Sequence, residues 1–375
     1  MRILVVGVSG CVGGIETLFF NLFGEKCDFA DVDFLSFGEP CAFAEKYAEN
    51  GYRNFILPTR KSSPFGFDKK VKEFLKTHDV YDYIWVNTAS TSMYQFQYYG
   101  KKYTKAKIIT HSHGTAMEKT SGSLLHFLNK ILARINRRKV TESTDFFFCC
   151  STAAGIALFG EKYRERLFVL HNAIDTEKYT FSPQNREILR RELSVSESDT
   201  VLGMIGRLSA HKNVLQGISI FAEYRKTVPE SCFFVIGEGE LREEAEALAK
   251  DLGVAEGVRF LGFRSDIPQL LSAMDILLMP SISEGLPLTA VEAQAAGVRC
   301  FLSDTISEEA KLTGLVTFLP LHETAESWAR SIRETYVLPP DRAMFGSEIV
   351  KAGYDIKTSR EALRAVLCHQ GENHG

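Results

Sequence analysis

The sequence has no uninterrupted run of about 18 apolar residues, the length that a membrane-spanning helix needs. No two of its eight cysteines have the C-x-x-C spacing of zinc and redox sites. Cys149 and Cys150 lie in the apolar stretch "DFFFCCS", which indicates buried thiols. The chain starts with apolar "ILVVGV" and continues into glycines rather than a cleavage site, so we expect no signal peptide and a reducing, cytoplasmic location.

Strong charge of either sign is also missing, since the formal net charge is −3 and the pI is about 6.3. Because there is no stacking-aromatic motif either, nucleic acid is a poor fit as a partner. The charge is nevertheless uneven: residues 1–170 hold 23 basic and 17 acidic side chains, and the remaining residues hold 21 and 30. This asymmetry suggests two domains that face different partners.

Short apolar runs typical of buried strands alternate with helical patterns along all 375 residues, which indicates an α/β protein with parallel sheets. The runs are "RILVVGV", "DVDFLSF", "NFILP", "YIWVN", "KIIT", "DFFFCCS", "LFVLHN", "TVLGMIGRL", "CFFVIGEG", "VRFLGF", "DILLMPS" and "VRCFLSD". The polar stretch "RRELSVSESDT" interrupts this rhythm and marks a boundary near residues 172–200. We therefore expect two doubly wound, Rossmann-like domains with an interdomain cleft, over residues 1–172 and 173–345, followed by a C-terminal segment over 346–375.

The opening stretch "MRILVVGVSGCVGGIETLFFNLF" places Gly7, Gly10 and Gly13 between an apolar strand and apolar residues at helical spacing. Strand, glycine turn and helix form the setting in which a dinucleotide fingerprint is meaningful. The pattern alone leaves two interpretations open: a dinucleotide cradle, or a loop that lets another ligand approach closely.

The stretch "MPSISEGLPLTAVEAQAAGVRC" is the most informative part of the chain. Glu284 follows a predicted strand, and a helix is expected to begin near Leu288 and to carry Glu292 one turn inside. Backbone N–H groups at the start of such a helix can hold a phosphate. A carboxylate one turn further can accept two hydrogen bonds from a ribose diol.

The stretch "GMIGRLSAHKN" places two cations, Arg207 and Lys212, on one loop after a predicted strand. Such a pair can neutralise a leaving diphosphate, the task that a magnesium ion performs elsewhere. No Asp-x-Asp motif ends a strand, because "DVD" at 31–33 precedes the apolar run "FLSF". We therefore expect a site that needs neither a metal ion nor another cofactor.

Several motifs occur together in a fixed order: Gly-Gly-x-Glu at 13–16, "GRLSAHKN", "VIGEGELREE", "LGF" and the pair Glu284 and Glu292 in "EGLPLTAVEAQAAG". With these motifs the chain resembles retaining glycosyltransferases of family 4, which have the GT-B fold of two Rossmann-like domains. "EGLP" and "SDTIS" resemble members from bacterial capsule and exopolysaccharide clusters. In this fold the last helix often returns to the N-terminal domain, and we expect the same of residues 346–375.

The resemblance implies a sugar nucleotide held mainly by the C-terminal domain, uridine being the expected base, and an acceptor held mainly by the N-terminal domain. The diphosphate would contact Arg207 and Lys212, and the ribose would contact Glu292. Glu284 is expected beside the transferred sugar as a catalytic residue. Further donor contacts are implied at Gly13, Gly14, Gly237, Glu238, Gly239, Gly285, Leu286, Pro287 and Leu288.

Two histidines follow a predicted strand in "KIITHSHG". His111 best matches the position at which the family has a histidine near the donor sugar, so we assign it a catalytic role. His113 and Glu16 are assigned to the acceptor side, although the helix dipole also favours Glu16 as a simple first-turn residue. No covalent nucleophile is implied, because in retaining enzymes of this kind the leaving phosphate can accept the proton of the acceptor.

A helical stripe of leucines and isoleucines with five basic residues occupies residues 121–140, in "SLLHFLNKILARINRRKV". One interpretation is a helix packed on the core with a solvated basic face. The other is a helix on an anionic membrane, close to a lipid-diphosphate acceptor.

We therefore expect a metal-independent, retaining glycosyltransferase that moves a sugar from a UDP-sugar to a glycan or lipid-linked acceptor in surface polysaccharide synthesis. A sugar-nucleotide 2-epimerase of the same fold and a catalytically silent sugar-nucleotide-binding protein are the alternatives. A short-chain dehydrogenase would explain the glycines and the Y-x-x-x-K of Tyr98 and Lys102. It would leave the second half of the chain unexplained.

Overall fold

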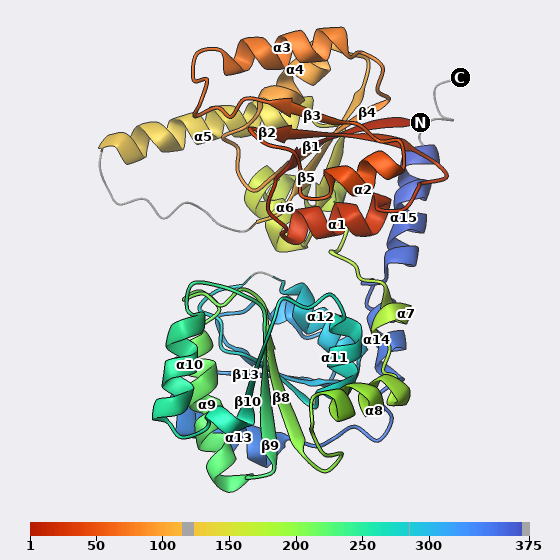
Figure 1. Ribbon diagram of the computed structural model, residues 1–375. Helices are drawn as coiled ribbons and strands as arrows, with labels where there is room; N and C mark the ends of the chain where they lie inside the picture. The colour runs from red at the N-terminus through yellow and green to blue at the C-terminus, as the bar shows by residue number, and fades with distance from the viewer. Residues whose placement is uncertain (115–123, 285, 370–375) are drawn as a thin grey trace. The chain divides into compact units, whose positions relative to one another are not determined.

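The computed structural model describes residues 1–114, 124–284 and 286–369, with the backbone alone for 124–131 and 369 (Figure 1). The chain folds into two compact units: unit 1 is Met1–Ala173 with Ile356–Gly375, and unit 2 is Ile174–Asp355. Each unit is a parallel sheet between helices, so the predicted fold class, doubly wound α/β, is confirmed. Within the described residues, no helix combines the length and the apolar character needed to cross a bilayer.

Unit 1 contains a seven-stranded sheet in the order β3-β2-β1-β4-β5-β6-β7, with every pair parallel. The strands are β1 (Arg2–Val8), β2 (Asp31–Phe37), β3 (Asn54–Leu57), β4 (Tyr83–Thr88), β5 (Lys107–Ser112), β6 (Phe146–Cys149) and β7 (Leu167–Val169). All seven coincide with the apolar runs of the sequence, because strands covered on both faces need apolar side chains at nearly every position. As expected, "DVD" at 31–33 is the entry of a strand.

The helices of unit 1 cover both faces of this sheet (Figure 1). They are α1 (Gly14–Phe23), α2 (Ala44–Glu49), α3 (Phe67–Thr77), α4 (Gln95–Tyr103), α5 (Leu124–Ser143), α6 (Thr152–Phe159) and α15 (Ile356–His369), with a 3₁₀ turn η1 (Glu161–Arg166). One core cluster joins the sheet to α1, α2 and α15, and a second joins it to α3 and α4.

Unit 2 contains a six-stranded parallel sheet in the order β10-β9-β8-β11-β12-β13. The strands are β8 (Thr200–Ile205), β9 (Ser231–Ile236), β10 (Val258–Gly262), β11 (Ile276–Met279), β12 (Arg299–Ser303) and β13 (Val316–Leu319). Five of them coincide with predicted runs. The short edge strand β13 was not predicted, although Gly314 and Pro320 flank its four residues "VTFL".

Two core clusters also enclose the sheet of unit 2. Its helices are α7 (Thr176–Tyr179), α8 (Pro183–Glu192), α9 (Val214–Thr227), α10 (Arg242–Asp251), α11 (Ile267–Ala273), α12 (Leu288–Ala295), α13 (Ala325–Thr335) and α14 (Phe345–Lys351). Short 3₁₀ turns lie at η2 (Ala255–Gly257) and η3 (Glu308–Ala310). The polar stretch expected to separate the domains instead begins inside α8.

The C-terminal segment changes unit later than predicted, at Ile356 rather than at residue 346. Residues 346–355 remain in unit 2 because α14 packs against α12 and α7. From Ile356 onward, Leu363 and Leu367 of α15 enter the same core cluster as α1. Arg360 also donates to the last carbonyls of α1, those of Asn21 at 2.7 Å and Leu22 at 3.1 Å.

The strand order reverses at one point in each sheet, between β1 and β4 in unit 1 and between β8 and β11 in unit 2. Ligands of open α/β sheets bind beside the carboxyl ends of the strands at such a point. A ligand site is therefore expected at the loops after these four strands.

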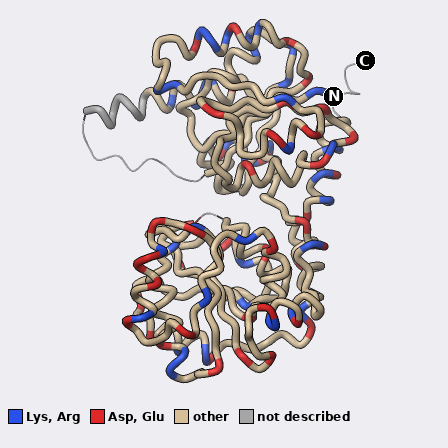
Figure 2. Tube along the Cα trace, viewed as in Figure 1, with Lys and Arg blue, Asp and Glu red and all other residues tan. Residues whose placement is uncertain are grey.

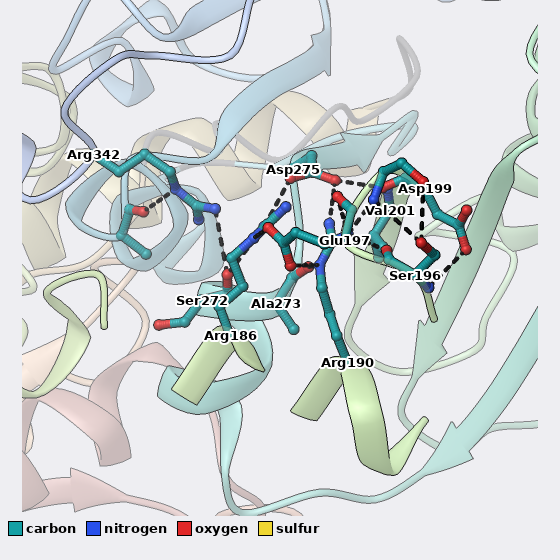
Figure 3. A network of polar contacts seen from close by, with 12 residues as sticks. Arg186, Arg190, Ser196, Glu197, Asp199, Val201, Ser272, Ala273, Asp275 and Arg342 are labelled. Atoms are coloured by element: carbon teal, nitrogen blue, oxygen red, sulfur yellow. Dashed lines mark hydrogen bonds and ion pairs between the residues drawn. The ribbon is translucent and has the colours of Figure 1, made fainter. Parts of the chain in front are cut away.

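Asp275 lies buried at the opposite, amino-terminal edge of the unit 2 sheet, between two arginines of α8 (Figure 3). Its carboxylate accepts from Arg190 Nη2 at 2.6 Å and from Arg186 Nη1 at 2.9 Å. It also accepts from the backbone N–H of Val201 on β8 at 2.8 Å. This single carboxylate thereby joins α8, β8 and β11.

Arg342 extends the network from the segment before α14 (Figure 3). It donates to the carbonyls of Ala296, Leu271 and Ser272 at 3.0, 2.9 and 3.3 Å. Burial of this guanidinium lowers its pKa to about 10. Gly297 has a φ of +66°, and a Cβ there would lie 2.6 Å from the Cβ of Arg342. Both the backbone conformation and this close contact therefore favour glycine at the position.

We predict that Asp275→Asn lowers the free energy of unfolding by about 3–5 kcal/mol, because it removes the buried carboxylate that pairs with both guanidinium groups and leaves them only the exposed carboxylate of Glu197. Urea denaturation of the full chain measures the loss. The matched control is Glu197→Gln, which removes an ion pair to the same Arg186 from a side chain that is 69% exposed. A change below about 1 kcal/mol is expected for this control. Equal losses in the two variants would contradict the assigned importance of Asp275.

Candidate functional site

In unit 2, the loops after β8 and β11 are joined to each other at the point where the strand order reverses. The N–H of Ile282 donates to the carbonyl of His211 at 2.9 Å. Asn213, in the left-handed region with a φ of +58°, donates through Nδ2 to the carbonyl of Pro280 at 3.0 Å. Two segments far apart in the sequence are thus held as one surface.

Lys212 and Glu284 form an ion pair across these two loops, with 2.5 Å between Nζ and Oε1. Their side chains are only 21% and 16% exposed, so the pair is far better shielded from water than an ordinary surface pair. Gly206, with a φ of +141°, lies beneath the lysine, and a Cβ there would lie 3.2 Å from Lys212 Cε. Both residues were predicted as site residues, and the structure brings them into direct contact.

Arg207 starts the same loop but does not join this pair. Its guanidinium lies 3.2 Å from Glu240 Oε2, and the two side chains are 75% and 54% exposed. An exposed ion pair of this kind contributes little to stability. Arg207 can therefore exchange Glu240 for another anion at small energetic cost.

Gly237, Glu238 and Gly239 form the loop after β9, directly against the loop after β8. A Cβ on Gly237 would come within 2.0 Å of the carbonyl oxygen of Gly206, and one on Gly239 within 2.3 Å of that of Leu208. The close approach allows the N–H of Leu208 to donate to the carbonyl of Glu238 at 2.9 Å. The two glycines are therefore required by contact between two backbones, a reason that is independent of any ligand. The Glu238 carboxylate itself pairs with Arg242 at 2.7 Å.

The helix α12 begins at Leu288, as predicted, with Pro287 before it and no side-chain cap on its first N–H groups. The side chains of Leu286 and Leu288 are partly buried and pack against a hydrophobic cluster that contains Ile349. Gly285 lies outside the described residues.

Glu292 lies one turn inside α12 and is partly buried. Burial raises the pKa of its carboxyl group, while a hydrogen bond from Tyr179 and the nearby charge of Lys178 lower it. Tyr179, on α7, was not predicted as a neighbour. Nothing in "DTEKY" indicates that contact, because it depends on how α7 packs against α12.

In unit 1, the glycine loop lies at the β1/β4 reversal. Gly13 is the residue before α1 and Gly14 its first residue, as the motif predicts. Glu16 is buried and accepts from both the N–H and the hydroxyl of Ser9, at 2.8 and 2.9 Å. The carboxylate of Glu16 thus joins the first turn of α1 to the glycine loop. The Ser9 contacts therefore already occupy a carboxylate that we had assigned to the acceptor side.

The structure separates the two histidines of "KIITHSHG", and His111, to which we assigned a catalytic role, is closed to a ligand. His111 is fully buried, with its ring near those of Trp85, Phe148 and His113. It lies two residues after Ile109 on β5 and therefore shares the core face of that strand. His113 lies beyond the end of β5 and is only partly buried, with Nε2 2.8 Å from Asn87 Oδ1. His113 is the histidine that a ligand can reach.

Burial lowers the pKa of both histidines, that of His113 to about 3. Both rings are therefore neutral at physiological pH. Within the part of the chain that the structure describes, no three histidine, cysteine, aspartate or glutamate side chains are grouped as metal ligands.

The comparisons with known proteins agree with this geometry. Residues 185–350 match the family model described as glycosyl transferases group 1. The chain is 29% identical over 362 residues to a Bacillus subtilis protein named as glycosyltransferase EpsF, covering 94% of this chain and 92% of that protein. It is 27% identical over 273 residues, 69% of this chain and 68% of the other, to the Escherichia coli UDP-Gal:alpha-D-GlcNAc-diphosphoundecaprenol alpha-1,3-galactosyltransferase.

Among solved structures, HepE of Anabaena, crystallised in complex with UDP, superposes with a TM-score of 0.75 at 22% identity. The match covers 98% of this chain and all of HepE. The lipopolysaccharide glycosyltransferase WaaG superposes with a TM-score of 0.67 at 18% identity, over 97% of this chain and 99% of WaaG. The two-unit architecture is therefore the GT-B fold.

We predict that the free energy of unfolding falls as the pH is lowered from 7.5 to 5. The unfolded chain protonates histidines near pH 6.5, whereas the folded chain keeps His111 and His113 neutral. The loss should be about 2 kcal/mol for each buried histidine, measured by urea denaturation at several pH values. In His113→Gln the loss of unfolding free energy between pH 7.5 and 5 should be smaller by the contribution of one histidine. An unchanged loss would contradict a neutral His113.

Proposed function

We propose that this chain, a glycosyltransferase with the GT-B fold, moves a sugar from a UDP-sugar to a glycan or lipid-diphosphate acceptor with retention of anomeric configuration and without a metal ion. Unit 2 holds the donor and unit 1 the acceptor. The observation that carries the proposal is the shielded Lys212–Glu284 ion pair at the β8/β11 reversal, beside the uncapped start of α12.

Lys212 and Arg207 supply the positive charge that a diphosphate leaving group needs. Lys212 is already oriented by Glu284, and Arg207 can turn from its exposed partner Glu240 at small energetic cost. Free N–H groups at the start of α12 add further donors for phosphate oxygens. Glu292, within the second turn of that helix, accepts hydrogen bonds from the ribose hydroxyls.

Glu284 acts through Lys212 and through hydrogen bonds to the hydroxyls of the transferred sugar. The acceptor hydroxyl attacks the anomeric carbon on the face from which the diphosphate leaves. Its proton passes to a phosphate oxygen of the leaving UDP, so no side chain has to form a covalent bond to the sugar. His113, rather than His111, is the unit 1 histidine that assists, because it is partly exposed.

The uridine base and the lipid-linked acceptor are proposed on the strength of the comparisons. HepE was crystallised with UDP, and the E. coli relative is named for UDP-Gal as donor and a diphosphoundecaprenol-linked sugar as acceptor. A Vi polysaccharide biosynthesis protein of Salmonella typhi and the lipopolysaccharide glycosyltransferase WaaG carry names that support a role in surface polysaccharide synthesis. EpsF, the E. coli relative and WaaG carry the names of transferases, which favours transfer over the 2-epimerase alternative.

The described half of α5 supports contact with an anionic membrane. Leu132 and Ile135 are 55% and 48% exposed, so this part of the stripe does not pack into a core. Arg134 and Arg138 alternate with them, and Figure 2 shows further basic positions along α3 and α4 of the same unit. Apolar side chains flanked by cations suit a headgroup region. The remainder of the predicted stripe lies outside the residues whose side chains are described.

We predict that UDP raises the melting temperature of the full chain, and that EDTA does not reduce this effect. Lys212→Met should weaken UDP binding about 10- to 100-fold, the value of a charge-assisted hydrogen bond. Glu292→Ala should weaken binding as well, whereas Arg207→Ala should mainly slow transfer.

The matched control is Lys226→Met, which breaks an exposed ion pair to Glu223 on α9. A response to NAD, or an equal small loss in all variants, would contradict the assignment.

We predict that the chain cosediments with vesicles containing anionic lipid and not with neutral vesicles, and that the binding weakens as salt is raised. Leu132→Ser with Ile135→Ser should abolish the binding, because the exposed apolar anchor is lost. The control pair Val337→Ser with Leu338→Ser removes exposed apolar residues of unit 2 and should leave the binding intact. Binding that ignores both salt and the α5 substitutions would contradict this role of α5.

A further inference from the structure

Asn87 lies at the end of β4, next to the first glycine of the opening motif. Gly7 has a φ of +92° and lies where the register of β1 with β2 shifts, and the pairing of β1 with β4 ends at Val6 and Val86. The Asn87 side chain continues this contact, because Nδ2 donates to the carbonyl of Val6 at 3.1 Å. A Cβ on Gly7 would lie 2.7 Å from the Asn87 carbonyl oxygen, so glycine permits the arrangement.

The other end of the Asn87 amide faces His113. A carbonyl can only accept, so the contact with Val6 determines that Nδ2 points to β1 and Oδ1 points to the ring. Oδ1 lies 2.8 Å from His113 Nε2 and can only accept. Nε2 must therefore carry the proton, and Nδ1 becomes the acceptor nitrogen of the ring.

Two further contacts restrict the same ring. The backbone N–H of His113 donates to the carbonyl of Thr88 at 3.0 Å, so the end of β4 holds both the main chain and the side chain. The ring of His111 lies 3.9 Å away, centroid to centroid, and is fully buried. Burial disfavours a charge on either histidine.

We propose that Asn87 is a positioning residue, which holds His113 as the neutral Nε2–H tautomer and so presents Nδ1 as an acceptor to a hydroxyl of the substrate. The part that concerns substrate rests on the proposed function. The tautomer follows from the contacts alone, so the two parts can fail separately. No bond is made or broken by Asn87 itself.

The tautomer is measured directly by long-range ¹H–¹⁵N correlation on the full chain labelled with ¹⁵N-histidine. The chain has nine histidines, and the signals that vanish in His113→Gln identify the ring. We expect the Nε2–H pattern in the unsubstituted chain and a shift to Nδ1–H or a mixture in Asn87→Leu. An Nδ1–H pattern in the unsubstituted chain overturns the proposal, as does an unchanged pattern in Asn87→Leu.

Kinetics test the consequence for transfer. Asn87→Leu should lower kcat about 10- to 100-fold while UDP binding, measured by melting temperature, is unchanged. Asn87→Asp keeps an acceptor for Nε2–H and should recover part of the loss. The matched control Asn54→Leu removes a partly buried, hydrogen-bonded asparagine from β3 and should leave both kcat and the tautomer unchanged.

If Asn54→Leu lowers kcat as much as Asn87→Leu, the loss reflects a general effect on stability, and the positioning role of Asn87 is overturned. If the unsubstituted chain shows the expected tautomer but transfers no sugar from any UDP-sugar, the proposed function fails and the assignment of the tautomer stands.

Discussion

The site of unit 2 depends on how closely the backbones of two loops approach each other. Gly237 and Gly239 meet the carbonyl oxygens of Gly206 and Leu208 at distances that no side chain would allow. This contact holds the loop after β8 against the loop after β9. From the held loop, Lys212 reaches Glu284 on the other side of the strand reversal. The position of the Lys212–Glu284 pair therefore depends on two glycines, Gly237 and Gly239, in the neighbouring loop.

The two units use the same architecture for different chemistry. At the strand reversal of unit 2 the groups are ionic, a shielded Lys212–Glu284 pair and an exposed Arg207, which suits a diphosphate. At the reversal of unit 1 the Glu16 carboxylate is already bound by Ser9, and the other groups are neutral: a glycine turn, the Asn87 amide and a neutral His113. Uncharged hydrogen-bonding groups suit hydroxyls and make no strong demand for a counter-ion. This division fits a charged donor and a hydroxyl-bearing acceptor.

Stability and chemistry lie at opposite edges of the unit 2 sheet. Asp275 and its arginines join α8, β8 and β11 at the amino-terminal edge, where no predicted site residue lies (Figure 3). The loops at the carboxyl edge carry the proposed site and are joined by backbone hydrogen bonds, the Asn213 side chain and the Lys212–Glu284 pair. Their exposed side chains, such as Arg207, can therefore serve a ligand without removing support from the fold.

The sequence by itself determined twelve strands, the start of α12 at Leu288 and the positions of the glycine loops, because apolar periodicity and turn chemistry are local properties. It also predicted Lys212 and Glu284 as site residues, but only the tertiary structure decided that they pair with each other. The same holds for Tyr179 beside Glu292, and for the choice of His113 over a buried His111. These contacts join segments that are distant along the chain. They are decided by strand order and by which face of a strand a residue occupies relative to the core, and neither is encoded in a short stretch of residues.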